Sequence, residues 1–330
     1  MSFTFTCISG FGKSGSGACV SLLKEFEFID GLNNEFRIAK DPYGLVDLEF
    51  SLASDWEFVR HDRAINDFLA YCRMLGRDDG LFKKAGKGFS KKLNVDFVKE
   101  SENFIKQLLS FTYYGDTLLH RYRLSAIESS IKRLRSKFGL SNEMPMYFAN
   151  PTSETFLVET QKYIKNLYKN YAAENNLKNI ILDQSVSPNN FNKTLRYFDT
   201  KKLIIIDRDP RDIFETMIRE RRLLGADMKN SIEKYITWHK TARGKFDLEK
   251  RNTDSSINLL ELKFEDFFID YENTISKLVE FLEIDFNHSQ KGSKFNPELM
   301  TDYVGIWKDN KNQESMKKLC KEFPKSCFHS

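Results

Sequence analysis

The chain has 330 residues, of which 41% are hydrophobic, 14% aromatic and 30% charged, and its formal net charge is only +4. This length is enough to bury a sizeable core. The small positive excess argues against a nucleic-acid partner, which usually requires a basic face, but it is compatible with a local basic pocket for an anionic ligand.

The five cysteines are scattered, odd in number and include no CxxC pair. This pattern favours neither a disulfide framework nor a zinc site, and it indicates a reducing compartment. The chain does not open on a basic segment followed by a long apolar one, and it has no run of about 20 apolar residues. We therefore expect a cytoplasmic protein without a signal peptide or a membrane span.

The first third of the chain predicts two strands and then helices. A strand at 3–8 is followed by a glycine-rich turn, a helix at 18–26 and a second strand, Phe36–Ala39, which ends at the turn residues Asp41–Gly44. From about residue 48 to residue 139 the pattern is mostly helical, with apolar residues three and four apart in segments such as Leu119–Phe138.

In the second half of the chain strands alternate with helices. Strands are predicted at 146–148, 180–183, 203–206 and 257–262, and helices at 154–171, 213–224, 232–248, 274–282 and 314–321. Alternation of this kind predicts an α/β fold with a P-loop-type parallel sheet flanked by helices. We expect one such domain over residues 1–330, with the helical block at about 48–175 as an insertion.

Ligands of parallel sheets bind at the carboxyl ends of the strands, and a glycine-rich run stands at the first of these ends. Gly10–Gly17, GFGKSGSG, lets the backbone turn tightly so that successive N–H groups converge at the start of a helix. Lys13 adds a full positive charge, and Ser14 and Ser16 add hydroxyl donors. The run predicts a cradle for a phosphate or sulfate oxyanion, with a flexible Gly/Ser turn as the alternative.

The loop alone leaves a magnesium–ATP kinase open. Gly12-Lys13-Ser14 matches the end of the G-x-x-x-x-G-K-[ST] pattern, although Cys7 occupies its first glycine position. Asp207 follows an apolar strand, as does the aspartate that holds magnesium in such enzymes.

The run Leu203–Arg222, LIIIDRDPRDIFETMIRERR, resembles the 3′-phosphate-binding signature of sulfotransferases. In that family a core strand leads to R-x-P-R-D, and a serine follows eight residues after the first arginine. Arg208 occupies the first arginine position, and Thr216 stands where the serine belongs and still offers a hydroxyl. The resemblance implies that both bind the 3′-phosphate of the donor; the alternative is a structural ion pair between Arg208 and Asp212.

Three further segments agree with this resemblance. The glycine run looks like the family's 5′-phosphosulfate loop, G-x-G-[KR]-S-G-[ST], which implies these donor contacts: Gly12, Lys13, Ser14, Gly15, Ser16 and Gly17. Leu259–Leu282 resembles the family's strand, [YF]-E-D and helix. Tyr303–Lys308 resembles its late G-x-W-[KR] element, which implies a donor contact by Lys308. An R-K-G triplet, which the family uses for the 3′-phosphate, is not apparent.

The resemblance covers residues 1–40 and 178–310 and implies a sulfotransferase. Such an enzyme moves a sulfuryl group from 3′-phosphoadenosine 5′-phosphosulfate (PAPS) to a hydroxyl acceptor, here a carbohydrate or another small molecule, without a metal. Lys13 would neutralise the charge that builds on the bridging oxygen. The helical block is similar to insertions in bacterial sulfotransferase-like proteins and is expected to shape the acceptor site. A non-catalytic nucleotide-binding relative remains a third hypothesis.

The sequence does not name the general base that must take the hydroxyl proton. Asp183 ends a predicted strand, where capping the following turn is its alternative role, and Asp41 follows the second predicted strand. Gln184 stands where many relatives have a lysine. We take Asp183 and Asp41 as the catalytic candidates. Asp47 and Glu49 also follow the second predicted strand, and His61, His120 and His239 are weaker candidates.

Overall fold

The computed structural model describes residues 2–80, 85–116, 124–222, 231–284, 288 and 290–328. The chain divides into two compact units. The first unit combines residues 1–40 with residues 171–330, and the second consists of residues 41–170. In the part of the chain that is described, no helix combines the length and the apolar composition needed to cross a membrane.

The first unit is built on a five-stranded sheet with the order β2-β5-β1-β6-β7, and all its described strand pairs are parallel. The strands are β1 (Thr4–Gly10), β2 (Ile29–Asp30), β5 (Asn179–Asp183), β6 (Lys202–Asp207) and β7 (Asn258–Lys263). Ile8 pairs with Asp183, and Gly10 pairs with Ile206. The carboxyl ends of the three middle strands therefore meet at one edge, and the predicted parallel α/β sheet is confirmed.

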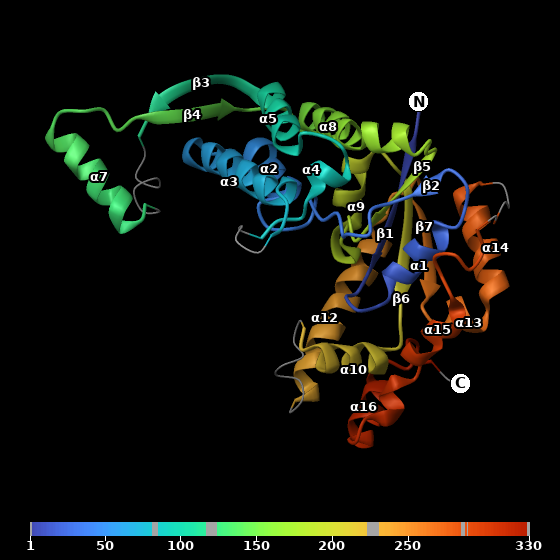
Figure 1. Ribbon diagram of the computed structural model, residues 1–330. Helices are drawn as coiled ribbons and strands as arrows, with labels where there is room; N and C mark the ends of the chain where they lie inside the picture. The colour runs from blue at the N-terminus through green and yellow to red at the C-terminus, as the bar shows by residue number, and fades with distance from the viewer. Residues whose placement is uncertain are drawn as a thin grey trace. The chain divides into compact units, whose positions relative to one another are not determined.

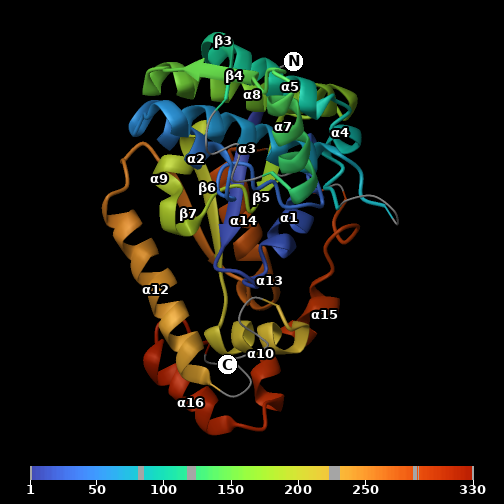
Figure 2. The same ribbon diagram turned by 90° about the vertical axis from the view of Figure 1, so that its left-hand side faces the viewer.

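Helices cover both faces of this sheet (Figures 1 and 2). On one side lie α1 (Ser16–Leu23), α13 (Asp266–Ile269) and α14 (Tyr271–Leu282), and on the other α9 (Phe191–Thr194) and α12 (Ile232–Arg251). The remaining elements are η2 (Pro188–Asn190), η3 (Leu195–Phe198), α10 (Pro210–Glu220), α15 (Pro297–Met300), η4 (Thr301–Tyr303), η5 (Ile306–Asp309) and α16 (Gln313–Glu322).

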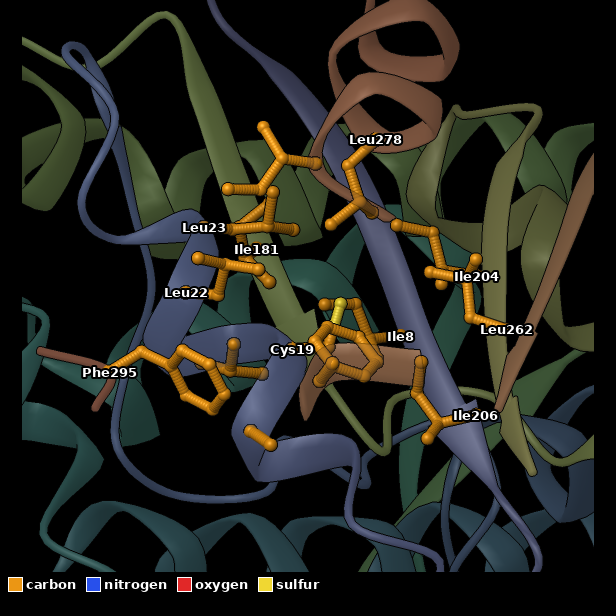
Figure 3. Packing of buried hydrophobic residues seen from close by; sticks show 14 of the residues in the cluster. Ile8, Cys19, Leu22, Leu23, Ile181, Ile204, Ile206, Leu262, Leu278 and Phe295 are labelled. Atoms are coloured by element: carbon orange, nitrogen blue, oxygen red, sulfur yellow. The ribbon is translucent and has the colours of Figure 1, made fainter. Parts of the chain in front are cut away.

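The packing of α1 on the sheet fixes the start of the glycine loop in space. Cys19, Leu22 and Leu23 of α1 belong to one buried cluster with Ile8 of β1 and Ile204 of β6 (Figure 3). Each fully buried aliphatic side chain of this kind contributes about 1.5–3 kcal/mol. The loop that joins β1 to α1 is thus held at both ends by the core.

The second unit is mainly helical and carries one antiparallel hairpin of β3 (Leu109–Gly115) and β4 (Met144–Ala149). Its helices are α2 (Leu45–Glu49), the π-helix η1 (Phe50–Ser54), α3 (Phe58–Gly76), α4 (Phe89–Lys92), α5 (Phe97–Leu108), α7 (Ala126–Lys137) and α8 (Ser153–Glu174), which continues into the first unit. The rings of Phe104 and Tyr163 stack at 4.7 Å and link α5 to α8.

Three of the predicted elements differ from the structure. The strand predicted at 146–148 is part of β4, which pairs antiparallel with β3 and does not belong to the parallel sheet. The prediction of a strand at Phe36–Ala39 is wrong, because the second strand is the short β2. The alternation of apolar and polar residues led to this prediction, and Phe36 and Ile38 are indeed buried while Arg37 is not. The segment makes one contact with the sheet, because the N–H of Phe36 donates to the carbonyl oxygen of Asp183 at 3.0 Å. Of the helix predicted at Leu119–Phe138, residues 119–123 lie outside the described residues, and the rest contains α7.

Candidate functional site

The glycine loop adopts a backbone that most side chains disfavour. Gly12, Lys13 and Gly15 have φ values of 76°, 58° and 87°, a region that glycine enters freely and that costs other residues roughly 1 kcal/mol. A Cβ atom at Gly15 would also lie 2.2 Å from the ring of Phe264. Conformation and packing therefore both require glycine at this position of the loop.

At the carboxyl edge of the sheet a cavity of about 830 Å³ gathers most of the predicted site residues. This volume is typical of small-molecule sites. The predicted residues in its lining are Gly12, Lys13, Gly15, Ser16, Gly17, Asp183, Arg208 and Thr216. The lining also includes Gln184, noted above for its place beside Asp183. The lining residues that were not predicted as site residues are Ala18, Ser21, Glu35, Arg37, Glu220, Arg222, Phe264 and Tyr303.

Arg208 joins three parts of the cavity wall. Its Nη1 donates to the carbonyl oxygen of Lys13 at 3.0 Å and to Oγ1 of Thr216 at 3.2 Å, and its Nη2 donates to the carbonyl oxygen of Tyr303 at 2.6 Å. The guanidinium also lies over the ring of Phe264, 4.8 Å from its centre. Burial lowers the pKa of Arg208. One donor, the buried Nε, has no partner among the described residues.

The alternative ion pair between Arg208 and Asp212 is not formed. Asp212 instead accepts from the backbone N–H groups of Gly305 at 2.8 Å and Trp307 at 3.1 Å. Burial raises the pKa of Asp212, and these two hydrogen bonds act against that rise. Asp212 therefore holds the segment that carries Tyr303 beside Arg208.

Lys13 and Glu220, the last residue of α10, form an ion pair within the cavity lining. Their side chains are 25% and 42% exposed, so water screens the pair and its contribution to stability is small. An anionic ligand that approached Lys13 would compete directly with this carboxylate.

Asp183 is the carboxylate in the lining whose environment is most perturbed. Burial raises its pKa to about 6, while a hydrogen bond with Ser16 acts in the opposite direction. Its Oδ1 has no partner among the described residues. Next to it, Gln184 donates to Ser16 Oγ at 3.0 Å and accepts from Nζ of Lys40 at 3.0 Å. Lys40 thus brings a positive charge next to position 184, where many relatives have a lysine.

Three other predicted residues are not among the residues that line this cavity. Ser14 is buried, and its Oγ has no partner among the described residues. Lys308 is exposed and does not line the cavity. Asp41 belongs to the second unit, where it accepts from the hydroxyl of Tyr71 at 3.2 Å.

The remaining base candidates are not among the lining residues either. Asp47, Glu49 and His61 belong to the second unit. His239 of α12 is buried, which lowers its pKa to about 3. His120 lies outside the described residues.

Only weak signals in the sequence pointed to the lining residues that the prediction of the site missed. Glu220 and Arg222 stand at the end of the run that includes Arg208, but only the observed length of α10 shows that this end returns to the glycine loop. Arg37 was assigned to a strand that does not exist. Tyr303 was noted within its segment, and its backbone carbonyl makes the contact, which no side-chain pattern reveals.

Fold and cavity together define a P-loop-type α/β protein with a basic, glycine-lined site at the carboxyl edge of its sheet. No group of three metal-ligating side chains is placed to hold a metal ion within the described ranges. The family model described as "Sulfotransferase family" matches residues 91–288, which is more than half of the chain. The chain therefore belongs to the sulfotransferase family.

Solved structures similar to the chain are also sulfotransferases. They include the sulfotransferase domain of the Synechococcus PCC 7002 olefin synthase (10% identity, TM-score 0.45, 98% of this chain and 95% of that chain). The sulfotransferase domain from the curacin biosynthetic pathway has 10% identity and a TM-score of 0.46 over 98% and 99% of the two chains. Sulfotransferase STF9 from Mycobacterium avium has 10% identity and a TM-score of 0.41 over 98% and 76%. A search of curated proteins by sequence gives no match.

Proposed function

We propose that the protein transfers a sulfuryl group from PAPS to a hydroxyl of a carbohydrate or another small molecule. The observation that carries this proposal is the convergence of the glycine loop, Arg208 and Thr216 on one cavity. The unpartnered Nε of Arg208 suits an anionic ligand, because a buried donor without an acceptor is costly. The glycine loop and Lys13 suit the phosphosulfate, and Arg208 with Thr216 suits the 3′-phosphate.

In this proposal Lys13 and Asp183 act on the transferring group from the lining of the same cavity. Lys13 neutralises the charge that develops on the oxygen bridging sulfur and the 5′-phosphate. Asp183 accepts the proton as the acceptor oxygen forms its bond to sulfur and the bridging bond breaks. A carboxylate whose pKa is raised to about 6 is close to the value that favours proton transfer near neutral pH. Asp41 stays a second candidate for this role.

A magnesium–ATP kinase is less well supported by the site. Its metal would need the carboxylate of Asp207, but Asp207 pairs with the guanidinium of Arg243 and accepts the N–H of Arg208 at 2.7 Å. The same cavity could serve a non-catalytic nucleotide-binding protein, which would bind the donor without turning it over.

We expect a reducing compartment such as the cytoplasm, since all five cysteines are free thiols.

Thermal stabilisation by three ligands tests the proposal. Adenosine 3′,5′-bisphosphate without metal should stabilise the protein more than adenosine 5′-phosphate or magnesium–ATP; at 100 times its dissociation constant it adds about 2.7 kcal/mol. Arg208→Ala should weaken binding of the bisphosphate far more than binding of the monophosphate. Arg221→Ala, at an exposed arginine that follows the opposite end of α10, is the control. A preference for magnesium–ATP would replace the proposal with a kinase.

A further inference from the structure

The second unit exposes an unusual apolar stripe on α7. Ile127, Ile131, Leu134 and Phe138 are between 54% and 74% exposed, and none of the 12 residues of this helix is buried. Figure 1 shows α7 beyond the end of the β3–β4 hairpin, apart from α3, α5 and α8 of the same unit. Single exposed apolar residues are ordinary, but a continuous stripe of them indicates an interaction surface.

The polar side of α7 and one flank of its apolar stripe are attached to its own unit. Lys132 forms an ion pair with Asp116 at 2.6 Å, and Arg135 Nη2 donates to the carbonyl oxygen of Ser141 at 2.7 Å. Asn142 Nδ2 donates to the carbonyl oxygen of Lys132 at 3.2 Å. A capping box between Ser125 and Glu128 closes the N-terminus of the helix. The helix is thus well formed and anchored, while its apolar stripe is left uncovered.

The spacing of the stripe matches the seam of a two-helix coiled coil. Its members are separated by four, three and four residues, which is the alternation of the two core positions of a heptad. If α7 pairs antiparallel with a second α7 about a two-fold axis, Ile127 meets Phe138 of the second copy, and Ile131 meets its Leu134. All four layers are then filled at once.

The charges that flank the seam suit this pairing with itself. Glu128 and Arg135 occupy the same flanking position, one residue after Ile127 and Leu134. In the antiparallel arrangement Glu128 of one copy comes beside Arg135 of the other, and symmetry repeats the contact. On the opposite flank Lys137 meets Ser130, so no like charges face each other. Self-complementarity of this kind is what a two-fold interface requires.

We propose that the α7 stripe is the contact through which two copies of this chain form a symmetric dimer. The short contact between two α7 helices gives an interface well below the size of permanent dimers, so we expect a dissociation constant on the order of 10 μM.

The alternative partner for a basic amphipathic helix is an anionic lipid surface. A lipid surface would use the charges of Arg133 and Arg135 alike, whereas the seam uses only Arg135.

Sedimentation velocity of the full chain from about 1 to about 200 μM tests the dimer. The wild type should shift from monomer to dimer, and Leu134→Glu should remain monomeric throughout. Arg135→Glu should raise the dissociation constant about 10-fold, because two contacts are lost. Arg133→Glu makes the same charge change outside the seam and should alter it by less than about 2-fold. Since Leu134 is exposed, its variant should keep the wild-type thermal midpoint and circular dichroism.

Three results would overturn the proposal. They are a wild type that stays monomeric at the highest concentration, a dimer that survives Leu134→Glu, and equal effects of Arg133→Glu and Arg135→Glu. A parallel flotation assay with phosphatidylserine vesicles identifies the lipid alternative. Binding of the monomer to these vesicles that both arginine variants weaken equally would assign the stripe to the membrane surface instead.

Discussion

Arg208 joins three parts of the cavity wall, and we propose that it also binds the donor. Three of its hydrogen bonds go to the glycine loop, to α10 and to the segment of Tyr303, so it organises the cavity before any ligand arrives. Only Nε remains without a described partner. Under our proposal, Arg208→Ala should disturb the glycine loop and also weaken binding of the 3′-phosphate. Arg208→Lys should restore neither, because an ammonium cannot reproduce the planar geometry of the guanidinium.

Asp183 should make stability and turnover depend on pH in opposite ways. Its pKa is raised from 3.8 to about 6 by burial, so ionisation costs the folded state on the order of 3 kcal/mol once the pH exceeds 6. Asp183→Asn should raise the free energy of unfolding in urea at pH 8 by up to that amount, by roughly half as much at pH 5 and by almost nothing below pH 3.8. The same change should abolish turnover. Wild-type turnover of PAPS should fall as the pH drops through about 6.

Asp302→Asn, an exposed change of the same kind, is the control for Asp183. Equal stability of Asp183→Asn and wild type at pH 8 would mean that the carboxyl carries no burial cost. Retained turnover would remove it as the base and leave Asp41 to be tested.

Glu220 should compete with the donor for Lys13. Glu220→Gln removes the carboxylate that pairs with Lys13, so we expect PAPS to bind several-fold more tightly, with a smaller change for adenosine 3′,5′-bisphosphate, which lacks the sulfuryl group. Isothermal titration measures both constants. In a Lys13→Ala background the gain should vanish, because coupled residues are non-additive. Glu35→Gln, which changes the same charge in the same lining, should not depend on Lys13; a gain that persists without Lys13 would contradict the competition.

At the scale of elements, the segment after β6 fastens the C-terminal part of the chain to the sheet. Asp209 caps α10 by accepting from the N–H of Arg211 at 2.8 Å, and it also accepts from the N–H of Phe328 at 2.8 Å. Arg211 lies over the ring of Trp307 at 3.9 Å. Arg211, Asp209 and Asp212 therefore hold the C-terminal part of the chain in place. Arg208 differs from them in that it lines the cavity.

Asp212→Ala tests this fastening. The change leaves the N–H groups of Gly305 and Trp307 without their acceptor, and the loss of two hydrogen bonds to a buried charge should lower the free energy of unfolding by about 3 kcal/mol. Urea denaturation measures the loss. Asp309→Ala, at a side chain that is 78% exposed, should cost less than about 0.5 kcal/mol. Equal costs would show that Asp212 does not hold this segment.

At the scale of the whole molecule, the two units have different tasks in our proposals. The first unit contains every residue of the cavity lining. The second unit, which the chain enters after residue 40 and leaves before residue 171, is proposed to shape the acceptor site and, through α7, to join two copies. Its contribution to the acceptor site stays a prediction, as does the description of residues 1–330 as one domain with an insertion.

The sequence by itself determined the parallel sheet, the glycine loop and the family, and it pointed to Lys13, Arg208 and Thr216, which line one cavity. Local signals carry these features, because buried strands read as apolar runs and tight turns demand glycine. Tertiary structure alone decided that Glu220 meets Lys13, that Lys40 reaches Gln184, that Asp212 binds Gly305 instead of Arg208, and that α7 leaves its apolar side uncovered. Such contacts join residues far apart in the chain, so only the path of the folded backbone brings them together.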